Sequence, residues 1–438
     1  MYGITHIKSG LIEGVPCGNP SYVVYKGIPY AAPPVGPRRW QPPSPPQPWD
    51  GVKKCDTFPP MAMQSKHTPG DFYQKEFFPV QLPMSEDCLY LNVWAPATSQ
   101  NTSNEKCPVM MWIHGGAYLA GYGHEMEFDG EAFCKRGVIL VTINYRLGIF
   151  GYFAHKSLSA ESPHSVSGNY GLLDQIYALK WIKENIHAFG GDPDNVTVFG
   201  QSAGGGSVQA LISSPLAKGL FSKAIVQSAA MVSLANDSLA DAEQLGADIC
   251  TLSGKDVDAL RELPADELFE LTGKTIGCRI QKEGSFKLWF SPCADGYVLP
   301  ESPVTAIEKG NHMDIQYMVG TAAGDYEPIA ALDPKAWAEN HIQLKRPPIY
   351  AYFFNHDIPG EDKPGAFHSS ELWYIFGTLA RCHRPMLGAD YQLSLTMTDY
   401  WTNFAKKGNP NNNGLPIWHA YTLKTPEILE LNGGIGLL

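Results

Sequence analysis

One short stretch constrains the fold more than any other part of the sequence, the GxSxG motif Gly200-Gln201-Ser202-Ala203-Gly204. An apolar run at 196–199 precedes it and predicts a buried strand, and Val208, Leu211 and Ile212 follow it at helical spacing. A serine at such a sharp strand-to-helix turn has a strained backbone that projects its hydroxyl above the sheet. The helix N-terminus points free N–H groups at the same place. We therefore predict that Ser202 is a nucleophile and not part of a glycine-rich packing turn.

Short apolar runs alternate with helical patterns over the rest of the chain. A helix is predicted at 172–186, and the polar stretch 237–271 has helical spacing typical of an insertion. The apolar runs lack alternation, as expected for parallel strands that are buried on both faces. They lie at 109–113, 138–143, 196–199, 224–226, 315–319 and 350–354. This order predicts an α/β fold with a mostly parallel sheet covered by helices on both faces.

A second motif, His114-Gly115-Gly116-Ala117, follows the predicted strand at 109–113. It matches the HGGG-type loop whose backbone N–H groups stabilise an oxyanion. Such a loop needs small residues, because a substrate oxygen must come within about 3 Å of the amides. We assign the donors to Gly116, Ala117 and Ala203, and we expect His114 to be structural. A tight turn without this role is the alternative.

Charge and cysteine usage exclude several classes of function. The 438 residues carry a net charge of −11, so nucleic acid and anionic membranes are poor partners. No apolar run is long enough for a membrane helix, and the N-terminus has no signal-peptide pattern. The nine cysteines are scattered without a CxxC, and no HExxH or Cys/His cluster occurs. We therefore expect reduced thiols, a cytoplasmic location, and no metal or other cofactor.

Four further segments carry recognisable motifs, namely 25–31 (YKGIPYA), 85–93 (SEDCLYLNV), 144–148 (NYRLG) and 168–175 (GNYGLLDQ). With the serine segment 199–205 they resemble the type-B carboxylesterase family, and within it the bacterial para-nitrobenzyl esterases. The resemblance covers nearly the whole chain. It implies an α/β-hydrolase fold as a single domain over 1–438, with a helical insertion or lid at about 235–345.

The resemblance also implies a catalytic triad in the chain order serine, acid, histidine. His368, in the segment 365–372 (GAFHSSEL), matches the family's base. Asp325 stands where the family carries a glutamate, and Glu327 is the alternative acid. Aspartate can hold the imidazole equally well, but its side chain is one methylene shorter, so its backbone must come closer. Ser228 matches a family position whose side chain supports the triad, and we assign Gln201, next to the nucleophile, the same supporting role.

Three departures from the family pattern concern the substrate. Gln201 replaces the glutamate of cholinesterases before the nucleophile, and Phe78 replaces their cation-binding tryptophan. Both changes argue against choline esters, because a phenylalanine face attracts cations less than indole does. Asp325 and His368 are only 43 positions apart, so family-typical residues are missing near the Pro334/Lys335 junction. Either the protein lacks them or the printed sequence omits them. Leu288 and Phe290, with Phe78, are candidates for the pocket wall.

These observations predict a serine carboxylesterase that cleaves a small-molecule ester through an acyl-enzyme and needs no cofactor. Two alternatives stay open. A non-catalytic scaffold or adhesion protein could share the fold, although such relatives typically lose the serine or histidine and this chain keeps both. The same residues could also hydrolyse amides, lactones or thioesters. The sequence does not distinguish among ester substrates or oligomeric states.

Overall fold

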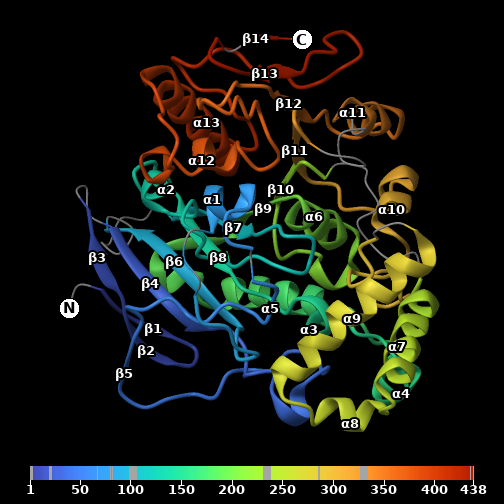
Figure 1. Cartoon of the computed structure of the whole chain (residues 1–438). Helices are drawn as coiled ribbons and strands as arrows, with labels where there is room; N and C mark the ends of the chain where they lie inside the picture. The colour runs from blue at the N-terminus through green and yellow to red at the C-terminus, as the bar shows by residue number, and fades with distance from the viewer. Residues whose placement is uncertain are drawn as a thin grey trace.

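The computed structural model describes residues 3–18, 22–66, 68–78, 80, 82–97, 106–229, 238–284, 287–325, 334–434 and 436–437. A twisted sheet of eleven strands runs through the molecule (Figure 1). Its strands, in spatial order, are β14 (Gly436–Leu437), β13 (Leu429–Leu431), β12 (Tyr350–Phe354), β11 (Gln316–Ala322), β10 (Lys223–Gln227), β9 (Gly191–Gln201), β7 (Cys107–Ile113), β8 (Ile139–Ile143), β6 (Tyr90–Pro96), β4 (Tyr22–Pro29) and β3 (Val15–Cys17). A small separate sheet contains β1 (Ile4–Ile7), β2 (Gly10–Glu13) and β5 (Val52–Lys54).

The central strands of the large sheet are parallel, as predicted. Every neighbouring pair from β8 through β7, β9, β10, β11 and β12 to β13 is parallel. The outer strands β6, β4 and β3, and β14 at the other edge, pair antiparallel. The sequence did not predict these outer strands. β3, β4 and β6 lie together beyond β8 at one end of the sheet, and β14 lies at the opposite edge. Antiparallel neighbours need no long crossover helix between them.

Helices cover both faces of this sheet (Figure 1). On one face lie α3 (Gly148–Tyr152), α5 (Tyr170–Asn185) and α6 (Ala203–Ser213), and on the other α2 (Glu131–Cys134), α12 (Leu372–Ile375) and α13 (Gly388–Lys407). The remaining helices are α1 (Phe72–Phe77), α4 (Lys156–Glu161), α7 (Leu239–Ser253), α8 (Val257–Arg261), α9 (Ala265–Glu283), α10 (Pro303–Lys309) and α11 (Pro334–Gln343). Three of them, α7, α8 and α9, form the helical stretch predicted after residue 237. No helix among the described residues is long and apolar enough to cross a membrane.

Strand β7 shows why the predicted strands lack an apolar–polar alternation. Val109, Met111 and Ile113 belong to the core beneath α5 and α6. Met110 and Trp112 point to the opposite face and belong to the core beneath α13. Successive side chains of a strand point to opposite faces, so a strand between two helical layers must be apolar at every position. The fold is therefore the helix-covered α/β sheet that the sequence predicted.

A buried ion pair joins two of the sequence motifs. Arg146 follows β8, and Asp174 lies in the first half of α5. The Arg146 guanidinium donates to both carboxylate oxygens of Asp174 at 2.8 Å, from Nε and from Nη2. The side chains are 3% and 0% exposed. The pair therefore fixes α5 against the carboxyl end of β8.

Replacing Arg146 with methionine should lower the free energy of unfolding by about 3–5 kcal/mol, because it leaves the Asp174 carboxyl buried without its partner. Urea denaturation of the purified variant measures this change. The double variant Arg146→Met/Asp174→Leu is the matched control, and it should recover more than half of the loss. A single variant as stable as the wild type would show that the pair does not hold the two motifs together.

Candidate active site

Ser202 lies between the end of β9 at Gln201 and the start of α6 at Ala203, as the motif predicts. Its φ angle of 56° lies in the left-handed region, which serine rarely adopts. The Ser202 N–H donates to the Gln227 carbonyl at 2.9 Å, and the Gly206 N–H donates to the Ser202 carbonyl at 2.9 Å. A Cβ atom at Gly204 would lie 2.1 Å from the Ile113 carbonyl oxygen. Only glycine therefore allows α6 to pass this close to β7 and the turn to form.

Unused backbone donors border the same place. Gly116 and Ala117 have positive φ angles of 99° and 57°, which turn the loop after β7 beside Ser202. Within the described part of the chain, the N–H groups of Gly116, Ala117 and Ala203 have no hydrogen-bond acceptor. Free N–H groups of this kind can stabilise an oxyanion. His114 at the start of the loop is fully buried, and burial lowers its pKa to about 4, so it stays neutral.

His368 and Asp325 are in direct contact. His368 Nδ1 lies 2.5 Å from Asp325 Oδ1, and the two side chains are 5% and 0% exposed. The second carboxylate oxygen, Oδ2, accepts a hydrogen bond from the Ala322 N–H at 2.9 Å. The carboxylate is thus held in place by the end of β11 while it orients the imidazole. Glu327, the alternative acid, lies outside the described residues.

The loops that carry these two side chains approach each other unusually closely. The Gly324 N–H donates to the Ala366 carbonyl at 2.8 Å. A Cβ atom at Gly324 would lie 2.6 Å from that same oxygen, so any larger residue would push the loops apart. Aspartate is one methylene shorter than glutamate, so its backbone must lie closer to His368. Gly324 allows this closer approach of the two loops.

Two residues predicted to support the triad have different surroundings. Gln201 is buried, with Nε2 3.3 Å from His368 Nε2, and its Oε1 accepts from the Ser369 hydroxyl at 3.1 Å. Gln201 therefore packs directly against the imidazole. Ser228 is also buried, follows β10, and donates its N–H to the Gly320 carbonyl at 2.7 Å. Its hydroxyl has no hydrogen-bond partner among the described residues.

Sequence reasoning missed the buried carboxyl group of Glu371, three residues after His368. Burial, together with the nearby charge of Asp325, raises the pKa of Glu371 to about 8. The group is therefore mainly neutral at pH 7. The glutamate in the GAFHSSEL segment was a visible signal, but its burial was not.

The stability of the protein should depend on pH through Glu371. The native state keeps this proton up to about pH 8, whereas the unfolded chain loses it near pH 4.5. The stabilisation is complete below the unfolded pKa and declines as pH rises toward the folded pKa, by about 1.4 kcal/mol per pH unit. The variant Glu371→Gln removes this dependence. Urea denaturation at pH 5 and pH 9 should show that the variant gains stability relative to the wild type at the higher pH. A difference that stays constant across this range would contradict the assignment.

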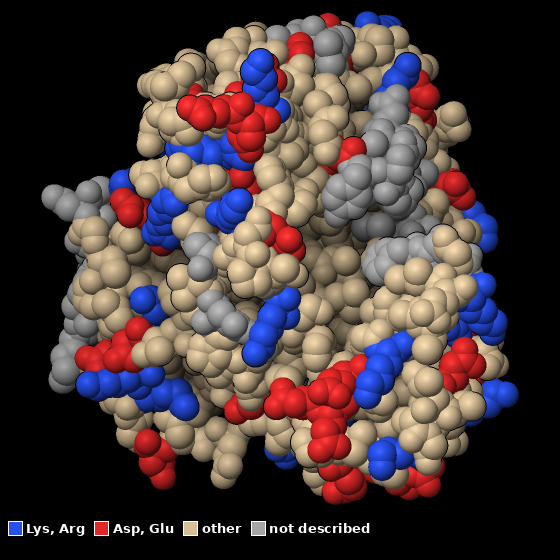
Figure 2. Space-filling model, in the orientation of Figure 1, with Lys and Arg blue, Asp and Glu red and all other residues tan. Residues whose placement is uncertain are grey.

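Ser202 and His368 border one cavity of about 480 Å³. Its wall contains the oxyanion loop, residues of α1, and Phe78, which was a predicted wall residue. Leu288 and Phe290 do not line it: Phe290 is buried in the core beneath α5, and Leu288 packs against that core. The apolar run 288–290 indicated burial but could not show which space it fills. Figure 2 shows that one face of the molecule is hollowed near its centre, with acidic and basic side chains interspersed around it.

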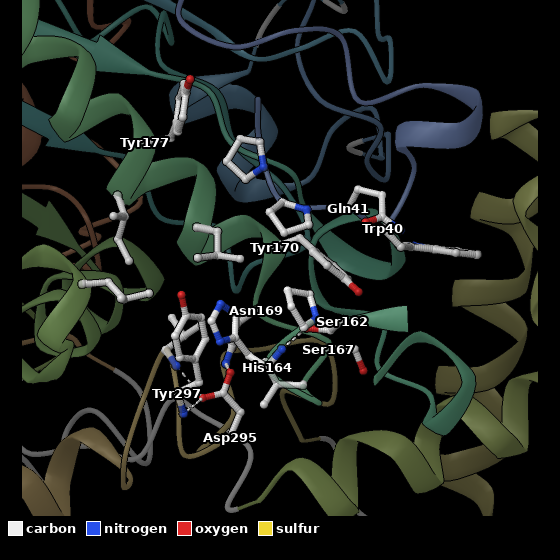
Figure 3. A pocket seen from close by; sticks show the side chains of 18 of the residues that line it. Trp40, Gln41, Ser162, His164, Ser167, Asn169, Tyr170, Tyr177, Asp295 and Tyr297 are labelled. Atoms are coloured by element: carbon white, nitrogen blue, oxygen red, sulfur yellow. Dashed lines mark hydrogen bonds between the residues drawn. The ribbon is translucent and has the colours of Figure 1, made fainter. Parts of the chain in front are cut away.

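A second cavity, of about 310 Å³, contains none of the predicted site residues (Figure 3). Its polar groups bind one another. Asp295 accepts hydrogen bonds from the Asn169 amide at 2.8 Å and from the Tyr297 N–H at 2.9 Å. The ring of His164 stacks on that of Tyr297, with centroids 3.7 Å apart. We therefore assign the chemistry to the first cavity.

Within the described ranges, one group of side chains has metal-ligand chemistry, namely Glu76, Cys382 and His383. Glu76 is already engaged by the Arg384 guanidinium, whose Nε lies 3.0 Å from both carboxylate oxygens. Arg384 also donates to Asp362 at 2.9 Å. An arginine that occupies the only carboxylate of the group opposes a bound cation, so the residues do not fit a metal.

A strand-to-helix serine, unused amides and an imidazole–carboxylate pair at the carboxyl edge of one sheet define a hydrolase of the α/β-hydrolase class. The model of the "Carboxylesterase family" matches residues 3–346 and 332–435. The chain belongs to the carboxylesterase family, and it is a carboxylic ester hydrolase.

Individual relatives agree with this assignment. The chain is 38% identical to the para-nitrobenzyl esterase of Bacillus subtilis, over 94% of this chain and 91% of that protein. It is 33% identical to the fumonisin B1 esterase of Sphingopyxis macrogoltabida, over 99% of this chain and 87% of that protein. A solved thermophilic PNB esterase superposes with a TM-score of 0.84 at 33% identity, and covers 100% of this chain and 98% of that one.

Proposed function

We propose that the protein is a serine carboxylesterase whose triad consists of Ser202, His368 and Asp325. One observation carries the proposal: His368, in contact with Asp325 at 2.5 Å, borders the same cavity as Ser202. A serine hydroxyl is a weak nucleophile until an adjacent base takes its proton, and that base needs a third group to orient it. The three groups come from loops after β9, β11 and β12, all at the carboxyl edge of parallel strands.

The reaction then follows from the roles of these groups. His368 Nε2 takes the proton of Ser202 as Oγ attacks the ester carbonyl, and Asp325 accepts Nδ1–H and stabilises the imidazolium. The N–H groups of Gly116, Ala117 and Ala203 donate to the oxyanion. His368 protonates the leaving alcohol, and water hydrolyses the acyl-enzyme by the same route. This sequence of steps needs no cofactor.

We propose small-molecule carboxylic esters as substrates. The printed names of the relatives are those of ester hydrolases, and aromatic side chains line much of the cavity. Amides, lactones and thioesters would require the same groups and are tested alongside. A single domain over 1–438 and a cytoplasmic location stay predictions.

We also propose that this chain has a shortened segment between acid and base. The Pro334/Lys335 junction lies in the first turn of α11, directly after residues that the structure does not describe. The alignment with the Bacillus enzyme spans 466 positions, more than the 438 residues of this chain. The two segments of this chain that the family model matches, 3–346 and 332–435, overlap at 332–346. This overlap includes the Pro334/Lys335 junction, where family residues are expected to be missing.

Covalent labelling with a fluorophosphonate, followed by peptide mass spectrometry, tests the proposal. The label should attach to Ser202 and abolish hydrolysis of 4-nitrophenyl butyrate. A panel of matched ester, thioester, lactone and anilide substrates then ranks the acyl groups that the enzyme accepts, with esters expected first. Absence of labelling on folded protein would favour the non-catalytic scaffold instead.

A further inference from the structure

Two glutamates border the cavity that contains Ser202, and the proposed reaction uses neither. Glu125 and Glu127 lie in the segment between β7 and α2, which also supplies the proposed oxyanion amides. Their residues are 7% and 1% exposed. Glu127 Oε2 is buried and has no hydrogen-bond partner among the described residues. Two adjacent carboxyl groups, one with an unsatisfied oxygen, therefore form part of the cavity wall.

Among the described residues that line the cavity, none is a lysine or arginine that could compensate this pair. The described residues that line the cavity include three acids, Asp71 with the two glutamates, and no lysine or arginine. Two arginines of the 380–384 region are already paired with other acids: Arg381 with Asp129 at 2.7 Å, and Arg384 with Glu76. Burial lowers the pKa of the adjacent His124 to about 4, so this ring is neutral at pH 7.

In the protein without ligand, the absence of a countercharge makes the charged form of Glu125 and Glu127 unfavourable. Burial raises the pKa of Glu125 to about 7, and burial together with Glu125 raises the pKa of Glu127 well above its usual value. The pair therefore keeps at least one proton near pH 7 and does not carry two full charges. A cation bound against the two carboxyl groups would instead favour their charged form, because each carboxylate would then have an opposite charge beside it in a site of low dielectric.

Hydrogen bonds hold the backbone around the pair and the Glu125 carboxyl group. The Tyr122 N–H donates to Glu125 Oε1 at 2.8 Å. The neighbouring N–H groups of Gly121 and Gly123 donate to Gln64 at 2.8 Å and to Asn144 at 2.7 Å. The Thr378 hydroxyl donates to the Glu127 carbonyl at 2.9 Å. A ligand would thus meet a preorganised site and would not need to order the loop.

The rest of the wall favours an organic cation over a hydrated metal ion. Aromatic residues of α1 and of the segments around it line the cavity together with the pair, namely Phe72, Tyr73, Phe77, Phe78 and Phe128. Aromatic faces attract cations and also bury a hydrocarbon chain. A ligand with an alkyl chain that ends in an ammonium group fits this wall, because the chain would pack on the aromatic rings and the ammonium would face the carboxylates.

We propose that Glu125 and Glu127 bind a protonated primary or secondary amine of the ester substrate, which they hold by charge-assisted hydrogen bonds in the cavity of Ser202. This inference rests on the proposed function and specifies its substrate class. An ammonium N–H would donate to the unpartnered Glu127 Oε2 and to Glu125. A quaternary ammonium carries the same charge but has no N–H to donate, so it should bind less well.

Inhibition of the wild-type enzyme is the first test and requires no variant. Hydrolysis of 4-nitrophenyl butyrate at pH 7.5 is measured with n-butylammonium, n-butyltrimethylammonium or 1-butanol as competing ligand. The primary ammonium should have an inhibition constant about tenfold below those of the other two, because a hydrogen bond to a charged group adds to the attraction. Equal inhibition by n-butylammonium and 1-butanol would overturn the proposal.

The variant Glu127→Gln tests which residues are responsible. Glutamine keeps the shape but cannot ionise beside the ammonium, so the inhibition constant for n-butylammonium should rise about tenfold relative to that for 1-butanol. The matched control is Asp71→Asn, which removes one negative charge from an exposed position of the same wall. It should change this ratio less than about threefold, because exposed charges are screened. Equal effects of both variants, or none, would contradict the assignment.

A second variant keeps this test decisive. If Glu127→Gln does not fold, as judged by circular dichroism, Glu125→Gln replaces it with the same expected change. Fluorophosphonate labelling of the wild type separates the two proposals. Labelled Ser202 without a preference for ammonium ligands would refute only the amine site, whereas absence of labelling would refute the proposed function itself.

Discussion

The variant Ser202→Ala should lose about 10⁴–10⁶-fold in kcat, since no other group can form the acyl-enzyme. The backbone at position 202 has a φ of 56°, which alanine tolerates no better than serine, so the fold should persist with a similar local strain. The residual rate would come from the N–H groups of the oxyanion loop and from binding. Initial rates with 4-nitrophenyl butyrate, at enzyme concentrations high enough to detect that residual rate, measure the loss.

A matched serine provides the control. Ser162 lines the second cavity, away from the proposed triad. Ser162→Ala should hydrolyse the ester at the wild-type rate and should still bind the fluorophosphonate. Near-normal hydrolysis by Ser202→Ala would remove Ser202 from the mechanism.

The variant Asp325→Asn should lower kcat about 10⁴-fold while the protein stays folded, as the same change does in other triads. Asparagine keeps the size of the side chain in the close contact between the loops at Gly324 and Ala366. It has no negative charge for the imidazolium, and its amide can turn an N–H toward His368 Nδ1 and favour the wrong tautomer. Steady-state kinetics at saturating ester measures the loss.

Two carboxyl variants are the controls for this experiment. Glu327→Gln and Glu371→Gln should each reduce kcat far less than Asp325→Asn. A larger loss in Glu327→Gln would move the acid to Glu327. The comparison is informative because all three changes remove one carboxyl group and keep the side-chain length.

Much of the fold could be predicted because local sequence carries its physical cause. The strand at 350–354 was predicted with the bounds of β12, and the runs at 109–113 and 138–143 correspond to β7 and β8 within two residues. Strands apolar on both faces are typical of parallel sheets with two helical layers, so the pattern indicated the architecture as well. The outer antiparallel strands β3, β4 and β6 were missed. Of these only β3 is at the sheet edge; β4 and β6 are largely buried, but Lys26-Gly27 and Asn92 interrupt their apolar runs.

From local sequence alone, the site could be predicted only where the residue types of a motif are themselves required by its backbone geometry. The GxSxG turn needs a close approach to β7, and glycine at 204 records that need in the sequence. The glutamates at 125 and 127 belong to no such motif. Nothing in a local pattern shows that the two side chains face a cavity or that no basic group lies opposite. Leu288 and Phe290 show the converse: an apolar run predicts burial, but not the space that the side chains fill.

The sequence by itself determined the strand–helix order, the serine turn and the family resemblance, because each depends on residues close together in the chain. Only the tertiary structure decided which groups meet across long separations. It brought Asp325 to 2.5 Å from His368 over 43 residues and placed Glu371 in a buried environment. It also put Glu125 and Glu127 in the wall of the cavity of Ser202. Contacts and burial of this kind arise from the packing of the whole sheet and its helices, which no short segment encodes.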